Sequence, residues 1–453
     1  MTQRFLKLGA FLTGNGSHGG SWRLPGVAPD AGTSFDLYRH VAQKLEVGKF
    51  DALFMNDTVS VPELDPHVLA RNTQATRWDP LTLLPALAVV TRHLGLIATA
   101  NTTYNEPYTL ARRFASLDQL SGGRAGWNLV TSLGGGENYN RDDHVLHAQR
   151  YERAEEFFDV ITGLWDSWDD GAVVGDKDSG IYLDVGKLHV LNHKGRHFQV
   201  KGPLNAPRPP QGYPVLAQAG SSDPGRELAA RTADLVFTAA QTLEEAQAFI
   251  RDVKGRAAKY GRGPDSLKVL PGVSVITAPT QAEAQAKYDQ LQDLLDPAAS
   301  LKSISNFINI GVDLSAHPLD GPVPLPDTIP ETNTHKSRQR LVLDLIRREN
   351  PTIRQLFRKL TAGGHRILIG TPEAVADDFA AWFHQGGADG FNIMFSHLPG
   401  GVDDFVDLVV PELQRRGLFR TDYEGRTLRE NLGLERPANR YAQGGRPVTA
   451  LAK

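Results

Sequence analysis

Short apolar runs alternate with amphipathic stretches along most of the chain. The clearest case lies between residues 94 and 133, where apolar runs at 94–100 and 124–130 each have the length of a buried parallel strand. Between them, an apolar face at helical spacing predicts a helix, and its members are Leu110, Phe114, Leu117 and Leu120. Polar residues follow both runs, at 101–103 and 131–132. Because parallel α/β folds bind ligands at the carboxyl ends of their strands, this β-α-β unit predicts a ligand-binding edge.

The same alternation recurs along the chain and predicts the fold class. Apolar runs that predict buried strands lie near residues 5, 51, 94, 124, 214, 235, 268 and 389, and predicted helices separate nearly all of them. About eight strands, each followed by polar residues, favour a closed (β/α)8 TIM barrel over an open doubly wound sheet. The glycine-rich matches are weak, and none lies on a first strand-to-helix turn, where a dinucleotide-binding fingerprint would lie.

Two stretches interrupt this pattern, at about 165–212 and 296–350. The first combines acidic turns with a proline-rich return and predicts short antiparallel strands. The second contains a proline- and aspartate-rich segment, 318–334, which predicts an exposed loop of the kind that covers a binding site. We therefore expect one barrel domain over 1–430 with two insertions, followed by a C-terminal tail at 431–453. Because the chain after Arg426 is charged and loses its periodicity, we expect it on the surface or against a partner.

Composition narrows the chemistry. The 453 residues carry a formal net charge of −3, so neither a nucleic acid nor an anionic membrane is expected as a partner, and the basic run 193–201 is interpreted as a solvated hairpin. The chain has no cysteine, which excludes disulfides, Cys-ligated zinc, iron–sulfur clusters and thiol nucleophiles. No apolar run approaches the roughly 20 residues that cross a bilayer, and the N-terminal residues resemble a first core strand rather than a secretion signal. We expect a cytoplasmic protein.

Residues from two predicted helices suggest an anion site. Gly220, Ser221 and Ser222 lie between a strand and a helix, where backbone N–H groups and hydroxyls suit a phosphate. The alternative is a plain helix cap by Ser222 or by the aspartate that follows it. His147 and Tyr151 are four residues apart and share a helix face, so both could donate to one anion. The alternative there is a capping histidine and a core tyrosine.

Further candidates follow two other predicted strands. Asp57, with the asparagine before it, ends a strand and faces the site in a barrel, although it could simply cap the loop. His18, Trp22 and Arg23 lie in a glycine-rich loop after the first strand, and such loops overhang the site in this architecture. The alternative is a mobile N-terminal loop. His144 and His147 could be metal ligands, but no carboxylate or second histidine pair has a convincing spacing, so no metal is expected.

Seven stretches, spread in order over nearly the whole chain, carry a family resemblance. They are FDALFMND (50–57), TTYNEPYTLARRFASLDQLSGGRAGWNLVTS (102–132), HAQRYERAEEF (147–157), SWDD (167–170), KGPLNAPRPPQGYPVLAQAGSS (201–222), GGADGFNIM (386–394) and LPGGVDDFVDLVVPELQRRGLFRTDYEGRTLRENLGL (398–434). With these motifs the chain resembles the bacterial luciferase-like flavin monooxygenases, in the branch of nitrilotriacetate monooxygenase component A, EDTA monooxygenase and dibenzothiophene-sulfone monooxygenase.

The resemblance implies a TIM barrel that binds reduced FMN (FMNH2), delivered by a separate NAD(P)H-dependent flavin reductase. It implies that O2 adds to the flavin C4a to give a peroxide, which oxygenates or cleaves a C–S or C–N bond of a small organic substrate. Relatives form dimers and tetramers, so a homodimer or homotetramer is expected. The protein would hold the flavin, exclude water and place the substrate.

The resemblance also implies roles for individual residues. Asp57 and Thr103 would lie near the isoalloxazine ring, and Asn128 would lie beside the flavin at the end of the fourth strand. The FMN phosphate would be held by His147, Tyr151, Ser221 and Ser222. The substrate pocket would begin at Phe11, His18 and Phe54, with Trp22 as a further aromatic wall. His18 is the candidate for donating to the peroxide or orienting the substrate.

Several alternatives stay open at this point. Aminopolycarboxylate substrates would require basic groups such as Arg23 and His18 near the site, whereas sulfones or thioethers would prefer the apolar surface of Phe11, Phe54 and Trp22. The chain could instead be a non-catalytic flavin-binding barrel. It could also be an F420-dependent oxidoreductase of the same superfamily, although such an enzyme would lack the C-terminal extension GLFRTDYEGRTLRENLGL.

Overall fold

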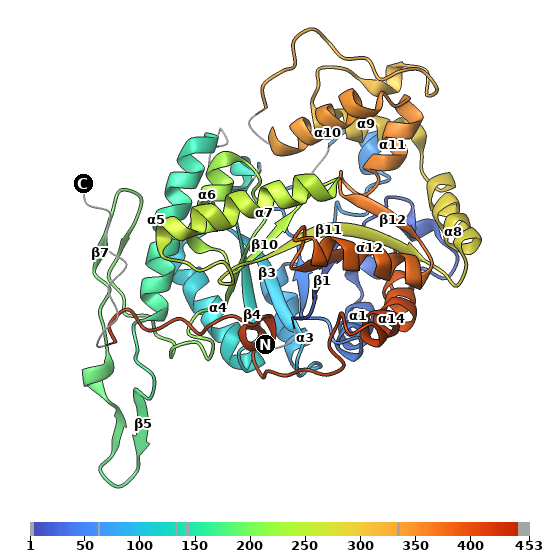
Figure 1. Ribbon diagram of the computed structural model, residues 1–453. Coiled ribbons are helices and arrows are strands. Elements are labelled where there is room, and N and C mark those ends of the chain that lie inside the picture. Colours follow the sequence, from blue (N-terminus) through green and yellow to red (C-terminus); the bar gives the residue numbers. More distant parts are fainter. Residues whose placement is uncertain (1–3, 62–63, 133, 141–144, 333–335, 443–453) are drawn as a thin grey trace.

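Eight parallel strands pair edge to edge into a closed ring in the computed structural model, which describes residues 4–61, 64–132, 134–140, 145–332 and 336–442 (Figure 1). The strands, in their order around the ring, are β1 (Lys7–Leu12), β2 (Ala52–Met55), β3 (Gly95–Asn101), β4 (Ala125–Val130), β9 (Val215–Gln218), β10 (Leu235–Thr238), β11 (Lys268–Thr277) and β13 (Gly390–Met394). β13 pairs with β1 and β10 pairs with β11, so the ring closes. The predicted TIM barrel is confirmed.

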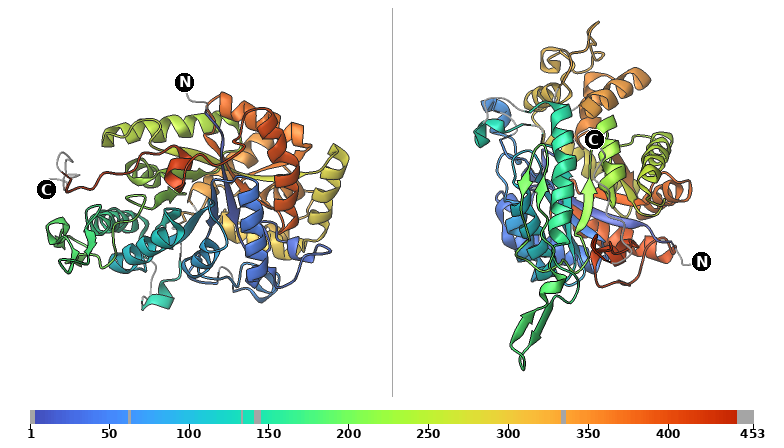
Figure 2. Two further views of the ribbon diagram at one scale, coloured as in Figure 1. Left: turned by 90° about the horizontal axis from the view of Figure 1, so that it is seen from below. Right: turned by 90° about the vertical axis from the view of Figure 1, so that its left-hand side faces the viewer.

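Helices follow the strands and cover the outside of the ring (Figure 2). They are α1 (Phe35–Val47), α3 (Pro80–Ala88), α4 (Pro107–Ser121), α5 (His147–Trp165), α6 (Asp223–Thr232), α7 (Leu243–Ala257), α8 (Gln281–Asp293) and α12 (Pro372–His384). Local signals set their ends: the Ser34 hydroxyl accepts from the N–H of Leu37 at the start of α1, and Gly122 ends α4 in the left-handed conformation, with φ of 67°.

The last helix of the barrel is broken into three pieces. It consists of α13 (Gly400–Asp404), a π-helical turn (Phe405–Val409) and α14 (Val410–Arg415). Pro411 lies at the start of α14 and has no N–H to donate to the preceding turn, which explains the irregular pitch. The sequence pattern predicts a single helix over 402–416, because periodicity does not distinguish a π-turn from a regular one.

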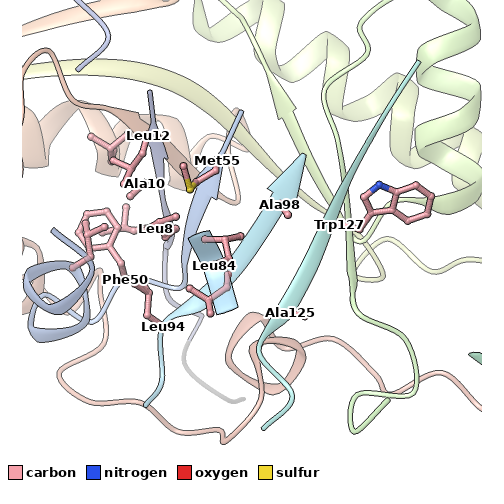
Figure 3. Close-up of a cluster of buried hydrophobic side chains, with 14 of the residues drawn as sticks. Leu8, Ala10, Leu12, Phe50, Met55, Leu84, Leu94, Ala98, Ala125 and Trp127 are labelled. Atoms are coloured by element: carbon pink, nitrogen blue, oxygen red, sulfur yellow. The ribbon is translucent and has the colours of Figure 1, made fainter. Parts of the chain in front are cut away.

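Apolar side chains on the outer faces of the strands pack beneath these helices (Figure 3). Trp127 is fully buried in this layer, and its indole N–H donates to the carbonyl of Ala100 at 2.9 Å. Three of the four predicted apolar positions of α4 are buried as expected, but Leu120 is 65% exposed. Leu120 lies in the last turn of α4, where Leu117 and Ser121 are buried, so its side chain is on the solvent-facing side of the helix.

The first insertion forms a projecting arm. Its strands pair antiparallel as predicted, in the hairpins β5 (Val173–Asp176) with β6 (Ile181–Leu183) and β7 (His193–Lys194) with β8 (Gln199–Val200). The hairpin β5–β6 extends well away from the barrel in two views (Figures 1 and 2).

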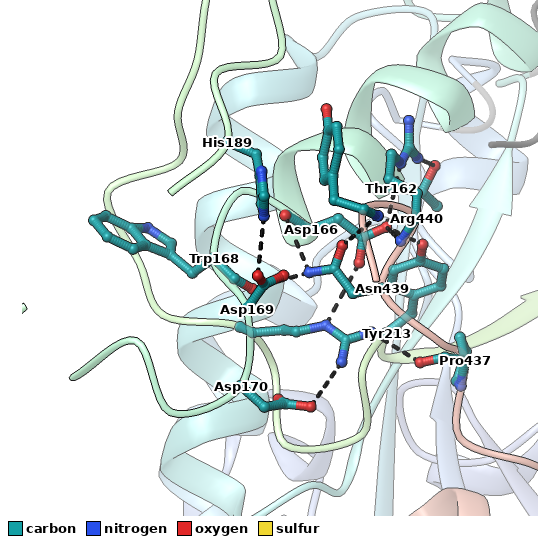
Figure 4. Close-up of polar contacts among 12 residues, drawn as sticks. Thr162, Asp166, Trp168, Asp169, Asp170, His189, Tyr213, Pro437, Asn439 and Arg440 are labelled. Atoms are coloured by element: carbon teal, nitrogen blue, oxygen red, sulfur yellow. Dashed lines mark hydrogen bonds and ion pairs between the residues drawn. The ribbon is translucent and has the colours of Figure 1, made fainter. Parts of the chain in front are cut away.

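A buried carboxylate ties this arm to the C-terminal segment (Figure 4). Asp166, at the end of α5, accepts from the Tyr213 hydroxyl at 2.5 Å and from Arg440 at 3.2 Å. The neighbouring Asp170 pairs with Arg208 at 3.0 Å. The SWDD motif at 167–170 therefore has a structural role in joining the insertion to the end of the chain.

The second insertion is more regular than the sequence predicts. It contains α9 (Pro297–Ile308), α10 (Lys336–Glu349) and α11 (Ile353–Leu360), which share an apolar cluster of their own that includes Leu301, Val342 and Leu356. A ninth parallel strand, β12 (Arg366–Gly370), follows and pairs with the second half of β11. We call the three helices the insertion lobe; they lie beyond the carboxyl end of β11 (Figure 1). The sequence pattern predicts neither α9 nor β12, because each follows closely on another helix and departs from the strand–helix alternation of the barrel.

Aspartates that immediately precede three strands organise the amino-terminal end of the barrel. Each buried carboxylate accepts a backbone N–H from the neighbouring strand: Asp51 from Leu8 at 2.7 Å, Asp234 from Leu216 at 2.9 Å and Asp389 from Val269 at 2.9 Å. Two of them also pair with arginines of the C-terminal segment, Asp51 with Arg420 and Asp234 with Arg429. This end of the barrel is therefore held by hydrogen bonds from strand to strand and by ion pairs to the C-terminal segment.

The C-terminal segment closes the same end. Leu428 and Leu432 of α15 (Leu428–Leu432) are fully buried and pack with Leu434 against interior residues such as Ala52 and Ile97. We call these three leucines the basal plug. The expectation that the chain after Arg426 lies on the surface or against a partner is therefore wrong for this segment. The sequence pattern does not reveal this apolar face, because charged residues alternate with the leucines. One of these charges, Arg429, is itself buried and paired with Asp234 at the base of the barrel.

The remaining elements are short. They are α2 (Pro66–Leu69) and the 3-10 turns η1 (Ser21–Arg23), η2 (Ala31–Thr33), η3 (Gly136–Tyr139), η4 (Val185–Lys187), η5 (Ala258–Tyr260) and η6 (Leu314–Ala316). No helix among the described residues combines the length and hydrophobicity that spanning a membrane requires.

Candidate active site

Aromatic side chains converge inside the barrel toward its carboxyl end. The rings of Phe11 on β1 and Phe54 on β2 lie 5.8 Å apart between centroids, and Phe237 on β10 lies 5.3 Å from the first and 5.9 Å from the second. His365, just before β12, stacks on Phe237 with centroids 4.9 Å apart and an interplanar angle of 3°. We call these four rings the aromatic row. The structure thus brings together two of the three residues expected to begin a substrate pocket.

Asn128 lies within β4, two residues before its end. Its Nδ2 donates to the Thr99 hydroxyl at 2.9 Å, and that hydroxyl donates to the carbonyl of Met55 at 2.7 Å. The Asn128 Oδ1 is buried and has no hydrogen-bond partner among the described residues. A buried acceptor without a donor costs free energy, so a group that donates to this oxygen would recover that cost.

Asn392, on β13, is a second unsatisfied amide and was not singled out from the sequence. Its Nδ2 and Oδ1 are both buried and lack partners within the described part of the chain. It pairs in register with Gly9 on β1 and Gly272 on β11, and a Cβ at Gly9 would lie only 2.7 Å from its Oδ1. The signal in the sequence is an asparagine in the middle of an apolar strand, GFNIM.

Asp57 follows β2 at the carboxyl rim and is partly buried. Burial and the nearby Asp79 raise the pKa of its carboxyl to about 6, while the Arg77 guanidinium opposes the shift. Burial lowers the pKa of Arg77 in turn. A carboxyl whose pKa is raised toward neutrality at the ligand-binding end of a barrel is a candidate for function.

Thr103 follows β3 and is buried. Its hydroxyl donates to the carbonyl of Thr131 at 2.6 Å and so joins the loops after β3 and β4. The hydroxyl proton is committed to this contact, so Thr103 can offer a ligand only its oxygen lone pairs.

Tyr151 and Ser222 meet, as the anion-site hypothesis requires. The Tyr151 hydroxyl lies 3.4 Å from the Ser222 Oγ, across α5 and α6. Ser222 is also the N-cap of α6, since its Oγ accepts from the N–H of Gly225 at 3.3 Å. The alternative prediction that Ser222 caps a helix is thus confirmed. Because Ser222 is the cap, the N-terminus of α6 lies beside the Tyr151 hydroxyl. A Cβ at Gly225 or Gly220 would lie 3.0 or 3.2 Å from that hydroxyl, so small residues shape this cradle.

For the other two residues expected at the phosphate, Ser221 and His147, the structure gives the position of the backbone. Ser221 precedes the cap, and its carbonyl accepts from Arg226 at 3.0 Å. His147 is the first residue of α5, one turn before Tyr151. His144 lies outside the described residues.

His18 is buried beside the C-terminal end of α8. Its Nδ1 accepts from the N–H of Gly20 at 3.1 Å, and its Nε2 lies 3.4 Å from the Gln292 amide nitrogen. Burial, with a smaller contribution from His397, lowers the pKa of His18 to about 4, so the ring is neutral at neutral pH. Because Nδ1 is an acceptor, the single ring proton lies on Nε2, and the group of Gln292 that can accept it is the amide oxygen, which has no other hydrogen-bond partner among the described residues.

One further residue of this loop, Arg23, also contacts the end of α8. Trp22 is half-buried in η1, and Arg23 donates to the carbonyl of Leu294. Arg23 is therefore committed to a backbone carbonyl of this helix, and the basic group nearest the aromatic row comes from elsewhere in the chain.

That group is Arg338 on α10, which the sequence did not single out. Its Nη2 donates to His365 Nε2, at the end of the aromatic row. Neither residue carries a local signal, since the contact joins the insertion lobe to the segment before β12. Burial and the neighbouring Arg338 lower the pKa of His365 well below its usual range, so this imidazole is also neutral.

Together these features define a class of protein: a TIM barrel with an anion cradle at a helix N-terminus and, inside the barrel, a cluster of aromatic rings and unsatisfied amides. The luciferase-like monooxygenase family model matches residues 19–390 of the chain. The chain belongs to this family and is a flavin-dependent monooxygenase.

Individual relatives match over nearly the full length. The chain is 50% identical to nitrilotriacetate monooxygenase component A of Aminobacter aminovorans, over 97% of this chain and 98% of that protein. It is also 50% identical to the N-acetyl-S-(2-succino)cysteine monooxygenase of Bacillus subtilis (strain 168), with the same coverage of 97% and 98%. The crystal structure of a riboflavin lyase with modified FMN and riboflavin superposes with a TM-score of 0.83, with 31% identity over 96% of this chain and 97% of that one.

Proposed function

We propose that the chain is the oxygenating component of a two-component monooxygenase that uses FMNH2 and O2 to oxygenate or cleave a C–S or C–N bond of a small organic substrate. Support for the bond type comes from the relatives, one of which is named for an amine substrate and another for a thioether. The designation "component A" implies a further component, which we propose to be an NAD(P)H-dependent flavin reductase. Because such a reductase draws on NAD(P)H, we propose that both act in the cytoplasm.

The observation that carries the proposal is the pairing of an anion cradle with unsatisfied amides inside one barrel. Tyr151, Ser222 and the N-terminus of α6 suit the phosphate of FMN. The unpaired Oδ1 of Asn128 and the amide of Asn392 suit a ring whose edge carries both N–H and C=O groups. The residues present therefore fit FMN.

When bound, the reduced flavin supplies the electrons that activate O2. The chain's own residues provide the surroundings. The aromatic row would keep water away from the bound flavin, which would protect reactive species from hydrolysis and strengthen polar contacts there. Asp57, with a pKa of about 6, can hold or release a proton at its carboxyl near neutral pH.

Replacing Tyr151 with phenylalanine or Ser222 with alanine is expected to weaken FMN binding by about 1–2 kcal/mol each, as for a lost hydrogen bond to a charged group. Isothermal titration of the purified protein with FMN measures the change. Tyr260→Phe is the matched control, because its hydroxyl donates to Glu227 at 2.8 Å on the outer surface. Unchanged affinity in both site variants would remove the phosphate from this cradle.

Oxygen uptake tests the function as a whole. With FMN, NADH and a generic flavin reductase, we expect uptake that depends on an added organosulfur compound or aminopolycarboxylate and yields a dealkylated or oxygenated product by mass spectrometry. Flavin oxidation that releases only hydrogen peroxide with every compound of the panel would contradict the proposal.

We also propose that the chain is a homodimer or homotetramer. The hairpin β5–β6 and the segment after it expose Val173, Ile181, Tyr182 and Val185, each at least half exposed, on an arm that projects from the barrel. Analytical ultracentrifugation gives the mass, and a monomer at micromolar concentration would contradict the proposal.

A further inference from the structure

Arg338 carries a positive charge to the end of the aromatic row. It projects from α10 in the insertion lobe, and its Nη2 donates to His365 Nε2. The His365 ring is held in place on its other sides, because it stacks on Phe237 and its Nδ1 lies against the backbone of Gly272. The guanidinium of Arg338 is therefore separated from the phenylalanines of the aromatic row by one side chain, that of His365.

Half of this guanidinium has no partner. Arg338 Nη1 is buried and makes no hydrogen bond with any described residue, and no carboxylate of the described chain lies within ion-pair distance of it. A Cβ at Gly364 would lie 3.5 Å from Nη1, so only backbone without a side chain faces it there. Burial lowers the pKa of Arg338 to about 10, and no acidic group counters the shift. At neutral pH the group still carries its charge.

Three other buried arginines have a carboxylate or several backbone carbonyls at the guanidinium. Arg420 and Arg429 pair with Asp51 and Asp234 at the amino-terminal end. Arg124 has no ion pair among the described residues, but its guanidinium donates to backbone carbonyls, including that of Leu94 at 2.7 Å. A buried cation without such compensation is costly, so an anion supplied from outside the chain would remove the cost.

We propose that Arg338 binds a carboxylate of the substrate, and that the enzyme is specific for substrates with a carboxylate at one end and an apolar or thioether group at the other. The inference rests on the proposed function, since it names the substrate class of the same site. The planar guanidinium can hold a carboxylate through two parallel hydrogen bonds. The aromatic row would then receive the less polar end of the same molecule. Because Arg338 belongs to the insertion lobe, the second insertion supplies the group that selects the substrate, while the barrel strands supply the phenylalanines of the aromatic row.

Two acid–amide pairs test the proposal: (phenylthio)acetate with (phenylthio)acetamide, and N-benzylglycine with N-benzylglycinamide. Isothermal titration into the FMN-loaded protein gives each Kd. We expect wild type to bind each acid at least tenfold more tightly than its amide, in line with a charge-assisted hydrogen bond. Arg338→Met is expected to abolish this preference without changing the Kd of the amides, and Arg338→Lys to keep part of it.

Arg340→Met is the matched control, because Arg340 lies on the same helix with its side chain 87% exposed. It is expected to leave all four Kd values unchanged. Equal affinity of wild type for acid and amide in both pairs, or a preference that survives in Arg338→Met, would overturn the proposal. If circular dichroism shows that Arg338→Met is unfolded, Arg338→Lys decides: an undiminished preference for the acids contradicts a bidentate contact. Substrate-dependent oxygen uptake is measured separately, so a protein that discriminates acid from amide without turnover would lose the proposed function and keep this site.

Discussion

Replacing Asp51 with alanine is expected to lower the free energy of unfolding by about 3–5 kcal/mol, the range for breaking a buried ion pair by removing one partner. Asp51 is buried at the amino-terminal end of β2 and pairs with Arg420, which is also buried. The same carboxylate accepts the N–H of Leu8 on the neighbouring strand at 2.7 Å. The substitution therefore leaves a buried cation and a buried N–H without their partners.

Thermal and chemical unfolding of the purified protein measure this loss. Asp422→Ala is the matched control, because Asp422 pairs with Lys49 at 3.0 Å in the same region but its side chain is 81% exposed. Exposed pairs contribute about 0–1 kcal/mol, so the control is expected to unfold almost as wild type does. Equal stability of the two variants would contradict a structural role for the buried pair.

Replacing Asp57 with asparagine is expected to lower turnover and not stability. Turnover is expected to fall about 100-fold, as for loss of a group that transfers a proton or stabilises charge. The free energy of unfolding is expected to rise at alkaline pH. Asp57 lies at the other end of the same strand, at the carboxyl rim. Steady-state oxygen uptake gives the turnover, and melting temperatures between pH 4 and pH 8 give the stability.

The sign of the stability change follows from the pKa. The folded state raises the pKa of Asp57 from 3.8 to about 6, mainly by burial, so the ionised carboxylate destabilises the fold. This cost is fully present above pH 6 and disappears below about pH 4, where the carboxyl is protonated in both folded and unfolded states. After allowance for solvent screening of this partly exposed group, we expect Asp57→Asn to be more stable by about 1–2 kcal/mol at pH 8 and by nothing at pH 4.

Asp36→Asn serves as the comparison, since Asp36 is an exposed residue of α1 with its side chain 80% accessible. It is expected to change neither turnover nor the pH dependence of stability. Full activity in Asp57→Asn would exclude this carboxyl from the site.

The sequence predicted the features that depend on local pattern. Eight strands followed from apolar runs and strand ends, and the meeting of Tyr151 with Ser222 agrees with the phosphate site that the family resemblance implies. The basal plug did not follow, because the leucines of 428–434 are interspersed with charges such as Arg429, whose partner Asp234 lies far earlier in the chain. Arg338 and His365 were missed for a related reason. Their contact depends on how the insertion lobe folds back on the barrel, and neither residue stands in a periodic pattern that indicates it.

The basal plug has a consequence for synthesis of the protein. Leu428, Leu432 and Leu434 emerge from the ribosome after every strand of the ring, so the nascent barrel stays open at its base until the segment that carries them has been synthesised. Until then the apolar lining at Ala52 and Ile97 has nothing to cover it and is a surface that chaperones can recognise. A stalled or prematurely terminated chain would therefore be a target for aggregation and degradation rather than a partly active enzyme.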